Sequence, residues 1–280
     1  MTARLLAISL VAAGLAWPAA PLAVVNVVIH DLEDGPAIPP GFSFVPGQFV
    51  YLSFQIAGYG ATQQRTLRLT CDVDAFDPKG IRLMETLPCN VAESLADEDK
   101  NWKPKIRLQT LIPPLAGSGA YKIAIRIKDE VNGQTAAEEL PFKVRGRDVP
   151  PSDELVVRNF HFYRGEDDPN PLPAAVYRPG ETLWARFDIT GYKFGPANAI
   201  QVDYRIAVLG PGGKVIYTQP EGEIAVEKSI SFYPKPYVPG AMNLNLQRTI
   251  RPGEYAIAVT ARDLLGNQSV EIKENFSIEQ

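Results

Sequence analysis

The chain has 280 residues and a formal net charge of −4, with 21% charged and 45% apolar residues. This composition is globular, excludes a basic nucleic-acid-binding surface and, at about 150 residues per domain, favours two domains. Two His, two Cys and three Met provide too few ligands for a His-rich metal centre or an iron–sulfur cluster. The 25 Pro and 22 Gly fall between short apolar runs, which is typical of an all-β chain.

The N-terminus has the pattern of a secretory signal peptide. One arginine precedes an uncharged apolar stretch at residues 5–17, and small residues with two prolines follow. We predict cleavage after Ala20 or Ala23, so that the mature protein is periplasmic or extracellular. An uncleaved N-terminal membrane anchor is the alternative, although the prolines interrupt the apolar stretch. No later segment approaches the roughly 20 apolar residues that a membrane span needs.

After this segment, apolar and polar residues alternate with a period of two. The clearest run is 121–128, where one face is predicted to be buried and the other to face water. Residues 91–100 are the one candidate for a helical turn or two. About seven short strands in about 125 residues is the spacing of an antiparallel β-sandwich. Strands are predicted, in chain order, at residues 24–29, 49–57, 66–76, 81–86, 105–112, 121–128 and 139–144.

An internal repeat runs through the chain at an offset of about 133 residues. Residues 46–59 align with residues 179–192 without a gap, and six of the fourteen aligned residues are identical. The repeat unit is far longer than the units of solenoid proteins, so it indicates a duplicated domain. We predict four segments: a signal peptide (1–23), a first domain (24–146), a polar, proline-containing linker (147–154) and a second domain (155–280).

The closing hairpin of each repeat carries a further pattern. A Gly-x-Tyr motif, which ends at Tyr121 in the first repeat and at Tyr255 in the second, precedes an alternating strand that ends in Asp. A Gly/Asn turn and a last strand follow it. This pattern resembles bacterial immunoglobulin-like domains, which are similar to fibronectin-III sandwiches. The resemblance implies two tandem antiparallel immunoglobulin-like β-sandwiches, with a structural corner where each of the two Tyr hydroxyls caps a backbone group. The Cys…Trp…Cys framework of antibody domains is absent.

Both cysteines belong to the first repeat. Cys71 lies on the predicted third strand and Cys89 lies eighteen residues later, while Tyr204 and Gly222 hold the matching positions of the second repeat. In an exported chain we predict a disulfide that pins the intervening loop, worth roughly 3 kcal/mol on the loop-entropy model. A redox-active pair would instead have Cys-x-x-Cys spacing and a nearby cation.

Two acidic runs occupy equivalent places in the repeats, each just before a Pro-rich turn. Clustered carboxylates at the end of a sandwich are candidates for Ca²⁺, which takes six to eight oxygen ligands. The alternative is that they are solvated turn residues, and no other cofactor is predicted. The runs comprise Asp31, Glu33 and Asp34 in the first repeat, and Glu166, Asp167 and Asp168 in the second.

Aromatic residues in Pro-rich loops are the other candidates for binding. Trp102 stands in such a loop of the first repeat, and Phe232, Tyr233 and Tyr237 stand in the matching loop of the second. Exposed rings can stack on a sugar or anchor a protein interface. The alternative is that these rings cover the edge of the sandwich.

The sequence contains little evidence for a catalytic site. His30 and His161 have no nearby nucleophile in a Gly-x-Ser-x-Gly context. Asp72 and Asp74 have a spacing that suits paired carboxylates, but Arg and Ala replace them in the second repeat.

The sequence therefore predicts a non-catalytic exported binding, adhesion or scaffold protein that presents loops to a protein partner. One alternative is a carbohydrate-binding accessory protein that uses the aromatic loops on an envelope polysaccharide. Another is a hydrolase, which would have a cleft and a carboxyl group with a raised pKa.

Overall fold

The structure is a computed structural model and describes residues 21–33 and 35–280. The predicted signal peptide falls almost entirely outside these residues, as does Asp34 of the first acidic run. Within the described ranges the chain forms seventeen strands, four short 3-10 helices and no α-helix, which confirms the all-β prediction. None of the described residues forms a helix that is long and apolar enough to cross a membrane.

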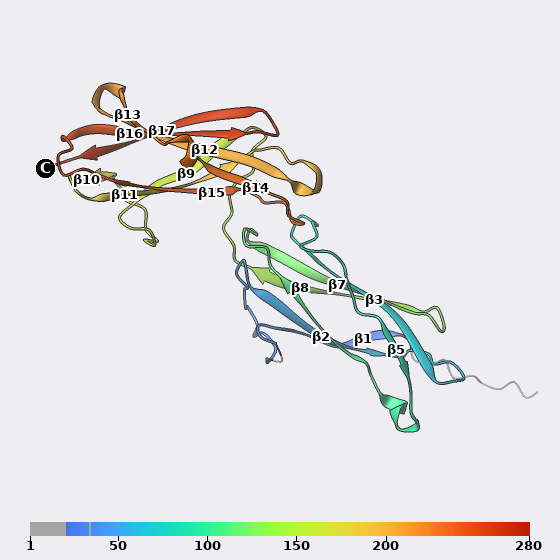
Figure 1. The fold of residues 1–280 in the computed structure, drawn as a ribbon. Coiled ribbons are helices and arrows are strands. Elements are labelled where there is room, and N and C mark those ends of the chain that lie inside the picture. The colour runs from blue at the N-terminus through green and yellow to red at the C-terminus, as the bar shows by residue number, and fades with distance from the viewer. Residues whose placement is uncertain (1–20, 34) are drawn as a thin grey trace, which may run out of the picture.

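Residues 23–144 fold into two sheets that face each other (Figure 1). One sheet has the strand order β1-β2-β6; the other has the order β4-β3-β7-β8, with β5 also paired to β3. Buried side chains from both sheets, among them Phe54 and Ile123, form one hydrophobic cluster. The strands are β1 Ala23–His30, β2 Phe49–Ala57, β3 Thr66–Phe76, β4 Leu87–Pro88, β5 Val91–Ser94, β6 Lys105–Leu111, β7 Gly119–Asp129 and β8 Thr135–Val144.

Residues 156–278 form a second pair of sheets around a separate hydrophobic cluster. The sheet orders are β15-β11-β9 and β10-β17-β16-β12-β13, with β14 also paired to β12. The β10–β17 pair is parallel, and the other strand pairs are antiparallel. The strands are β9 Val156–Tyr163, β10 Val176–Tyr177, β11 Thr182–Thr190, β12 Ile200–Leu209, β13 Val215–Thr218, β14 Ala225–Ser229, β15 Val238–Asn245, β16 Gly253–Asp263 and β17 Gln268–Ile278.

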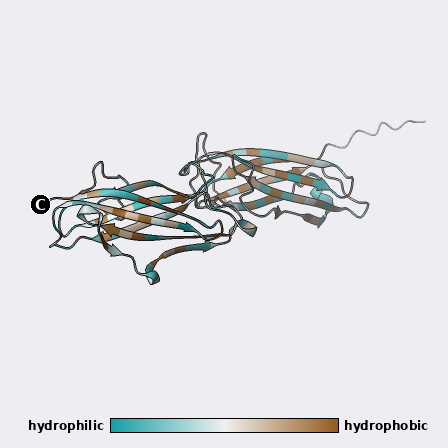
Figure 2. Cartoon of the chain, turned by 90° about the horizontal axis from the view of Figure 1, so that it is seen from above, coloured by the Kyte–Doolittle hydropathy of each residue, from teal (hydrophilic) through white to brown (hydrophobic). Residues whose placement is uncertain are grey.

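The two halves lie end to end and give the molecule an elongated shape (Figures 1 and 2). Figure 2 shows hydrophobic and hydrophilic residues alternating along the strands of both halves. In β2 the buried residues include Phe54 and Ile56, and their repeat counterparts in β11, Phe187 and Ile189, are buried as well. Each side chain of this kind contributes about 1.5–3 kcal/mol on burial, so the period-two pattern drives the formation of both cores.

A β-bulge recurs in the first strand of each half. Asn26 and Asn159 have left-handed backbone conformations, with φ of 51° and 52°, a region that asparagine tolerates better than most residues. The bulge shifts the register of β1 on β2 and of β9 on β11. Each Asn also donates a side-chain hydrogen bond across to the next strand, to Gln55 at 2.6 Å and to Asp188 at 2.8 Å.

The prediction of a strand at residues 81–86 is wrong. Asp77 Oδ1 accepts hydrogen bonds from the backbone amides of Lys79 and Ile81, so the chain turns back there without forming a ladder. Between β3 and β6, the chain pairs with β3 only through a bridge at Arg82 and through the short strands β4 and β5. Residues 91–100 divide into β5 and the 3-10 helix η1 (Asp97–Asn101).

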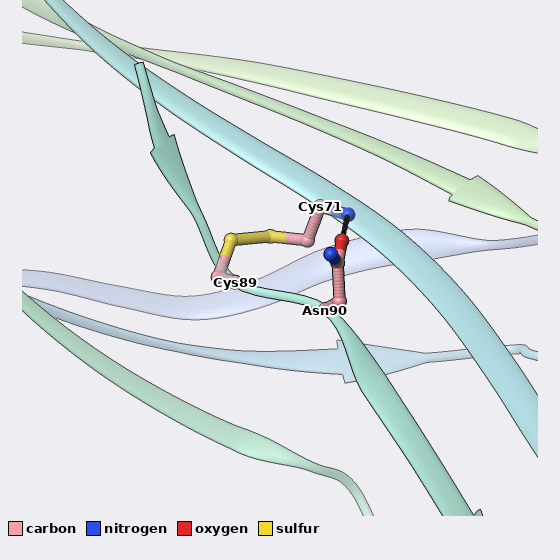
Figure 3. Close-up of a disulfide and its surroundings, with 3 residues drawn as sticks. All are labelled: Cys71, Cys89 and Asn90. Carbon is pink, nitrogen blue, oxygen red and sulfur yellow. Dashed lines mark hydrogen bonds between the residues drawn. A yellow bond between two sulfur atoms is a disulfide. The ribbon is translucent and has the colours of Figure 1, made fainter. Parts of the chain in front are cut away.

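The predicted disulfide between Cys71 and Cys89 is confirmed (Figure 3). The Cys89 amide donates to the Cys71 carbonyl at 2.7 Å, and Asn90 Oδ1 accepts from the Cys71 amide at 3.0 Å. Both sulfurs belong to buried residues of the first core. The bond therefore fastens the irregular segment after the turn to the central strand β3.

The two tyrosines of the closing hairpins make the same contact. The Tyr121 hydroxyl donates to the Gly117 carbonyl at 2.9 Å, and the Tyr255 hydroxyl donates to the Arg251 carbonyl at 2.8 Å. In both cases the acceptor lies four residues upstream. Both rings are buried, so each hydroxyl holds the preceding loop against the end of its core.

Candidate functional site

The two halves meet where the loop between β14 and β15, residues 230–237, contacts the end of the first half; we call this loop the docked loop. Its Tyr233 packs against the hydrophobic cluster of the first half. The Tyr233 hydroxyl donates to Asp77 Oδ2 at 3.0 Å. Burial and the neighbouring Asp77 carboxylate raise the pKa of the Tyr233 hydroxyl, so it remains a donor at any physiological pH.

We call the region where the two halves meet the joint. The segment that connects the halves contributes a second contact there. Arg147 forms an ion pair with Asp188, a fully buried residue of β11 that also accepts from Asn159 Nδ2 at 2.8 Å. The Arg147 guanidinium lies 5.6 Å from the centre of the Tyr237 ring. Burial raises the pKa of the Tyr237 hydroxyl, against the opposing effect of Arg147. A buried carboxylate needs such partners, so the connecting segment is held against the second half.

An apolar cavity of about 560 Å³ lies between the halves. Leu83 and Met84 line it from the first half, and Phe232 and Tyr233 line it from the second. The Arg82 guanidinium lies 5.5 Å from the centre of the Phe232 ring. Three of the four aromatic residues predicted for binding, Phe232, Tyr233 and Tyr237, therefore make contacts in the joint.

The fourth aromatic candidate lies in the counterpart of the docked loop. Residues 95–104, which we call the free loop, connect β5 to β6 as the docked loop connects β14 to β15. In the free loop the Trp102 carbonyl accepts from the Tyr59 hydroxyl at 2.6 Å. In the docked loop the Lys235 carbonyl accepts from Tyr192, the repeat counterpart of Tyr59, at 2.7 Å. The free loop lies at the end of the first half that points away from the second half (Figure 1).

A cleft of about 740 Å³ opens at the free loop. Tyr59, Leu95 and Trp102 contribute apolar surface to its walls, and Arg65 and Asp99 contribute charge. Trp102 is 39% exposed. This end of the molecule therefore combines an accessible ring with an open concave surface, the combination that binding sites commonly show.

Polar contacts give the free loop a defined shape. Asp99 Oδ2 accepts from the Ala96 amide at 2.8 Å, and Asp97 forms an ion pair with Arg65. Burial raises the pKa of the Tyr59 hydroxyl, and the Asp99 carboxylate adds to this shift. The hydroxyl therefore keeps its proton and its hydrogen bond to the loop, and the rim of the cleft carries the negative charge of η1.

Comparison with known proteins identifies no family. No family model matches the chain, and no curated protein matches it. Among solved structures, the C-terminal domain of the Streptococcus agalactiae AgI/II polypeptide BspA matches with a TM-score of 0.32 and 12% identity, covering 93% of this chain and 100% of that chain. The C-terminal domain of the Streptococcus pyogenes antigen I/II-family protein AspA has a TM-score of 0.32 and 12% identity, with 91% and 99% covered. Red sea bream transglutaminase has a TM-score of 0.27 and 10% identity, with 91% and 31% covered. Similarity at this level carries no functional argument.

The acidic runs lie on exposed loops. Asp31, Glu33, Glu166 and Asp167 are exposed, and Asp168 Oδ1 accepts from the Asn170 amide at 3.0 Å. Across the described part of the chain, no group of three or more His, Cys, Asp or Glu side chains is placed to hold a metal ion. Calcium binding by these runs stays a prediction.

The hydrolase alternative predicts a carboxyl group with a raised pKa, and Asp74 shows the opposite shift. Burial by itself raises the pKa of Asp74, but the hydrogen bond from Thr86 at 2.6 Å and the ion pair with Arg126 outweigh it. The pKa of Asp74 is therefore lowered, and the carboxylate serves as a buried partner for Arg126 across the β3–β7 ladder.

One polar pair, for which the residue pattern holds no signal, forms across β1 and β2. His30 Nε2 lies 2.9 Å from Ser53 Oγ, and His30 Nδ1 lies 3.1 Å from the Pro36 carbonyl. Because a carbonyl only accepts, Nδ1 carries a proton and the Nε2 of a neutral ring accepts from Ser53. The repeat counterparts of the pair are Tyr163 and Arg186, which stack at 3.6 Å. In both halves the pair ties the following loop to the sheet, since Arg186 also donates to the Asp168 carbonyl. This is a structural role.

Proposed function

We propose that the chain is an exported, non-catalytic binding protein that engages a protein partner through the cleft at the free loop. Two immunoglobulin-like domains, residues 24–146 and 155–280, with a linker at 147–154, would form an elongated stalk for this site. A signal peptide at residues 1–23 would direct the chain to the periplasm or the cell exterior.

The observation that carries this proposal is the unequal use of equivalent loops. In the docked loop Tyr237 is buried and Tyr233 packs against the first half, whereas Trp102 in the free loop is exposed beside an open cleft and, in the described part of the chain, contacts no residue of the other half. A large exposed ring on a concave surface is a typical interface anchor. Since the free loop is held in shape by Tyr59 and Asp99, a partner would meet a preformed surface at little entropic cost.

The experiment compares Trp102→Ala with Leu32→Ala, a control that removes another exposed apolar side chain outside the cleft. Each variant is used to capture proteins from the native cell envelope, and each is tested for retention on envelope polysaccharide. We expect Trp102→Ala to lose a protein that the unmodified chain and Leu32→Ala both retain. Equal capture by all three chains would contradict the proposal, and loss of polysaccharide retention alone would favour the carbohydrate-binding alternative.

A further inference from the structure

The joint between the halves has two sides, and each side has a repeat counterpart elsewhere in the chain. One side is the docked loop, whose counterpart is the free loop at Trp102. The other side is residues 77–84 of the first half, which contribute Asp77, Arg82 and the apolar lining of the joint cavity. At the repeat offset of 133 residues, their counterpart is residues 210–217.

Strand pairing supports this equivalence independently of the alignment. Phe76 at the end of β3 bridges to Arg82, and Leu209 at the end of β12 pairs with Val215. The segment at 210–217 therefore leaves the second half as the segment at 77–84 leaves the first. Figure 1 shows β13 at the end of the second half that points away from the joint.

The two segments differ in whether they are covered. Leu83 is buried and lines the joint cavity, whereas its counterpart Ile216 is 54% exposed. Val215 and Tyr217, on the opposite face of this short strand, are exposed as well, so both faces of β13 present large side chains to solvent. Scattered exposed apolar residues are ordinary, but an edge strand whose large apolar side chains are all exposed offers a surface on which another chain can pack.

We propose that this strand docks into the Trp102 cleft of a second copy of the chain. The elongated molecule would then carry the repeat counterpart of one side of its internal joint at each end, and a head-to-tail contact would bring the two counterparts together (Figure 2). The charges are complementary, since η1 beside the cleft carries Asp97, Glu98 and Asp99, and Lys214 is exposed beside Val215. A contact between different surfaces that does not close on itself produces linear chains of molecules.

The contact between molecules is weaker than the internal joint. The counterpart of Asp77 is Gly210, so the hydrogen bond that Tyr233 makes in the joint has no equivalent. No linker raises the local concentration of the two surfaces, whereas the connecting segment does so within the chain. Assembly therefore depends on protein concentration and is favoured where the protein is crowded.

The test uses two variants, each of which removes one side of the contact. Trp102→Ser changes the cleft, and Ile216→Lys places a charge in the exposed strand. Both side chains are accessible, so we expect both variants to fold, and circular dichroism checks this. Sedimentation velocity over a hundredfold concentration range should show linear oligomers of the unmodified chain and of Leu32→Ala. Each of the two variants should associate at least tenfold more weakly.

Mixing the two variants provides the decisive measurement. Each variant keeps one intact side, so an equimolar mixture should form 1:1 dimers and nothing larger. The proposal is wrong if the unmodified chain stays monomeric throughout the range, if either variant associates as well as the unmodified chain, or if the mixture remains monomeric.

This inference rests on the proposed function only in using the same cleft. If the chain stays monomeric but Trp102→Ala still loses an envelope protein, self-association is wrong while the proposed binding function stands. If the mixed variants dimerise and no envelope protein depends on Trp102, the cleft serves self-assembly and the proposed function fails.

Discussion

The docked loop and the free loop occupy the same position in two copies of one fold, yet they make different contacts. In each, a tyrosine from the neighbouring strand end fixes a main-chain carbonyl of the loop, so the local architecture is the same. The docked loop packs Tyr233 against the first half, whereas the free loop leaves Trp102 exposed beside a cleft. Equivalent loops therefore make a contact within the chain in one half and border an open cleft in the other.

The halves also differ in how their edges are secured. In the first half the strands beside β3 are short, since β4 has two residues and β5 has four. In the second half β13 and β14 pair with β12 over three and five residues. The Cys71–Cys89 bond fastens β3 to the stretch between β4 and β5, where the pairing of the first half is interrupted.

Removing the disulfide should have the largest effect and should act on one half. We expect the double variant Cys71→Ala, Cys89→Ala to lower the unfolding free energy of the first half by about 3 kcal/mol, because the unfolded chain regains the freedom of an eighteen-residue loop. Hydrogen exchange read by mass spectrometry separates peptides of the two halves. Equal destabilisation of both halves would show that they unfold as one unit.

A smaller effect is expected from the Asp74–Arg126 ion pair, which has no equivalent at the same register in the second half. Asp74→Asn should lower the unfolding free energy by about 1–3 kcal/mol at neutral pH, since Arg126 is half exposed and solvent screens part of the interaction. Chemical denaturation at pH 7 gives this difference.

The pH dependence of that effect has a definite sign. The pKa of Asp74 is lowered in the folded state, so its contribution is complete above the ordinary Asp value of about 3.9 and is lost as the pH falls through the lowered value. The unmodified chain and Asp74→Asn should therefore converge in stability in acid. A gap that stays constant down to pH 2 would assign the effect to packing.

The smallest expected change in stability comes from a direct comparison of the docked and free loops. Tyr233→Phe removes the hydrogen bond to Asp77 and should cost about 1 kcal/mol at the joint. Exchange of the amides in residues 77–84 should then rise about fivefold. Tyr59→Phe, the control, removes a similar hydroxyl contact in the free loop and should leave exchange at the joint unchanged.

The sequence predicted those features that depend on local pattern. The strands at Phe49–Ala57 and Thr66–Phe76 have the predicted bounds because strict alternation over nine and eleven residues leaves one face to bury. The disulfide followed from the cysteine spacing and an inferred exported state. The strand predicted at 81–86 failed because the side chain of Asp77 and the contact with the second half determine the conformation of that segment.

The candidate site was only partly predictable for a similar reason. Trp102 and Tyr233 both lie in Pro-rich aromatic loops, and nothing local distinguishes them. Tyr233 becomes partly buried through a contact with the end of the first half, where it donates to Asp77, 156 residues away in sequence. The pairing of His30 with Ser53 depends on the bulge at Asn26, whose backbone conformation is invisible in the residue pattern.

The direction of the strands has a mechanical consequence. The first strands of the halves, β1 and β9, and the last strands, β8 and β17, run along the length of the molecule (Figure 1). Hydrogen bonds of an antiparallel ladder lie perpendicular to its strands. A pulling force between the two ends would therefore slide β9 lengthwise along β11, and the bonds of the ladder would have to break together, not one after another. We expect the chain to resist tension better than its modest size suggests, a property that suits a tether under load.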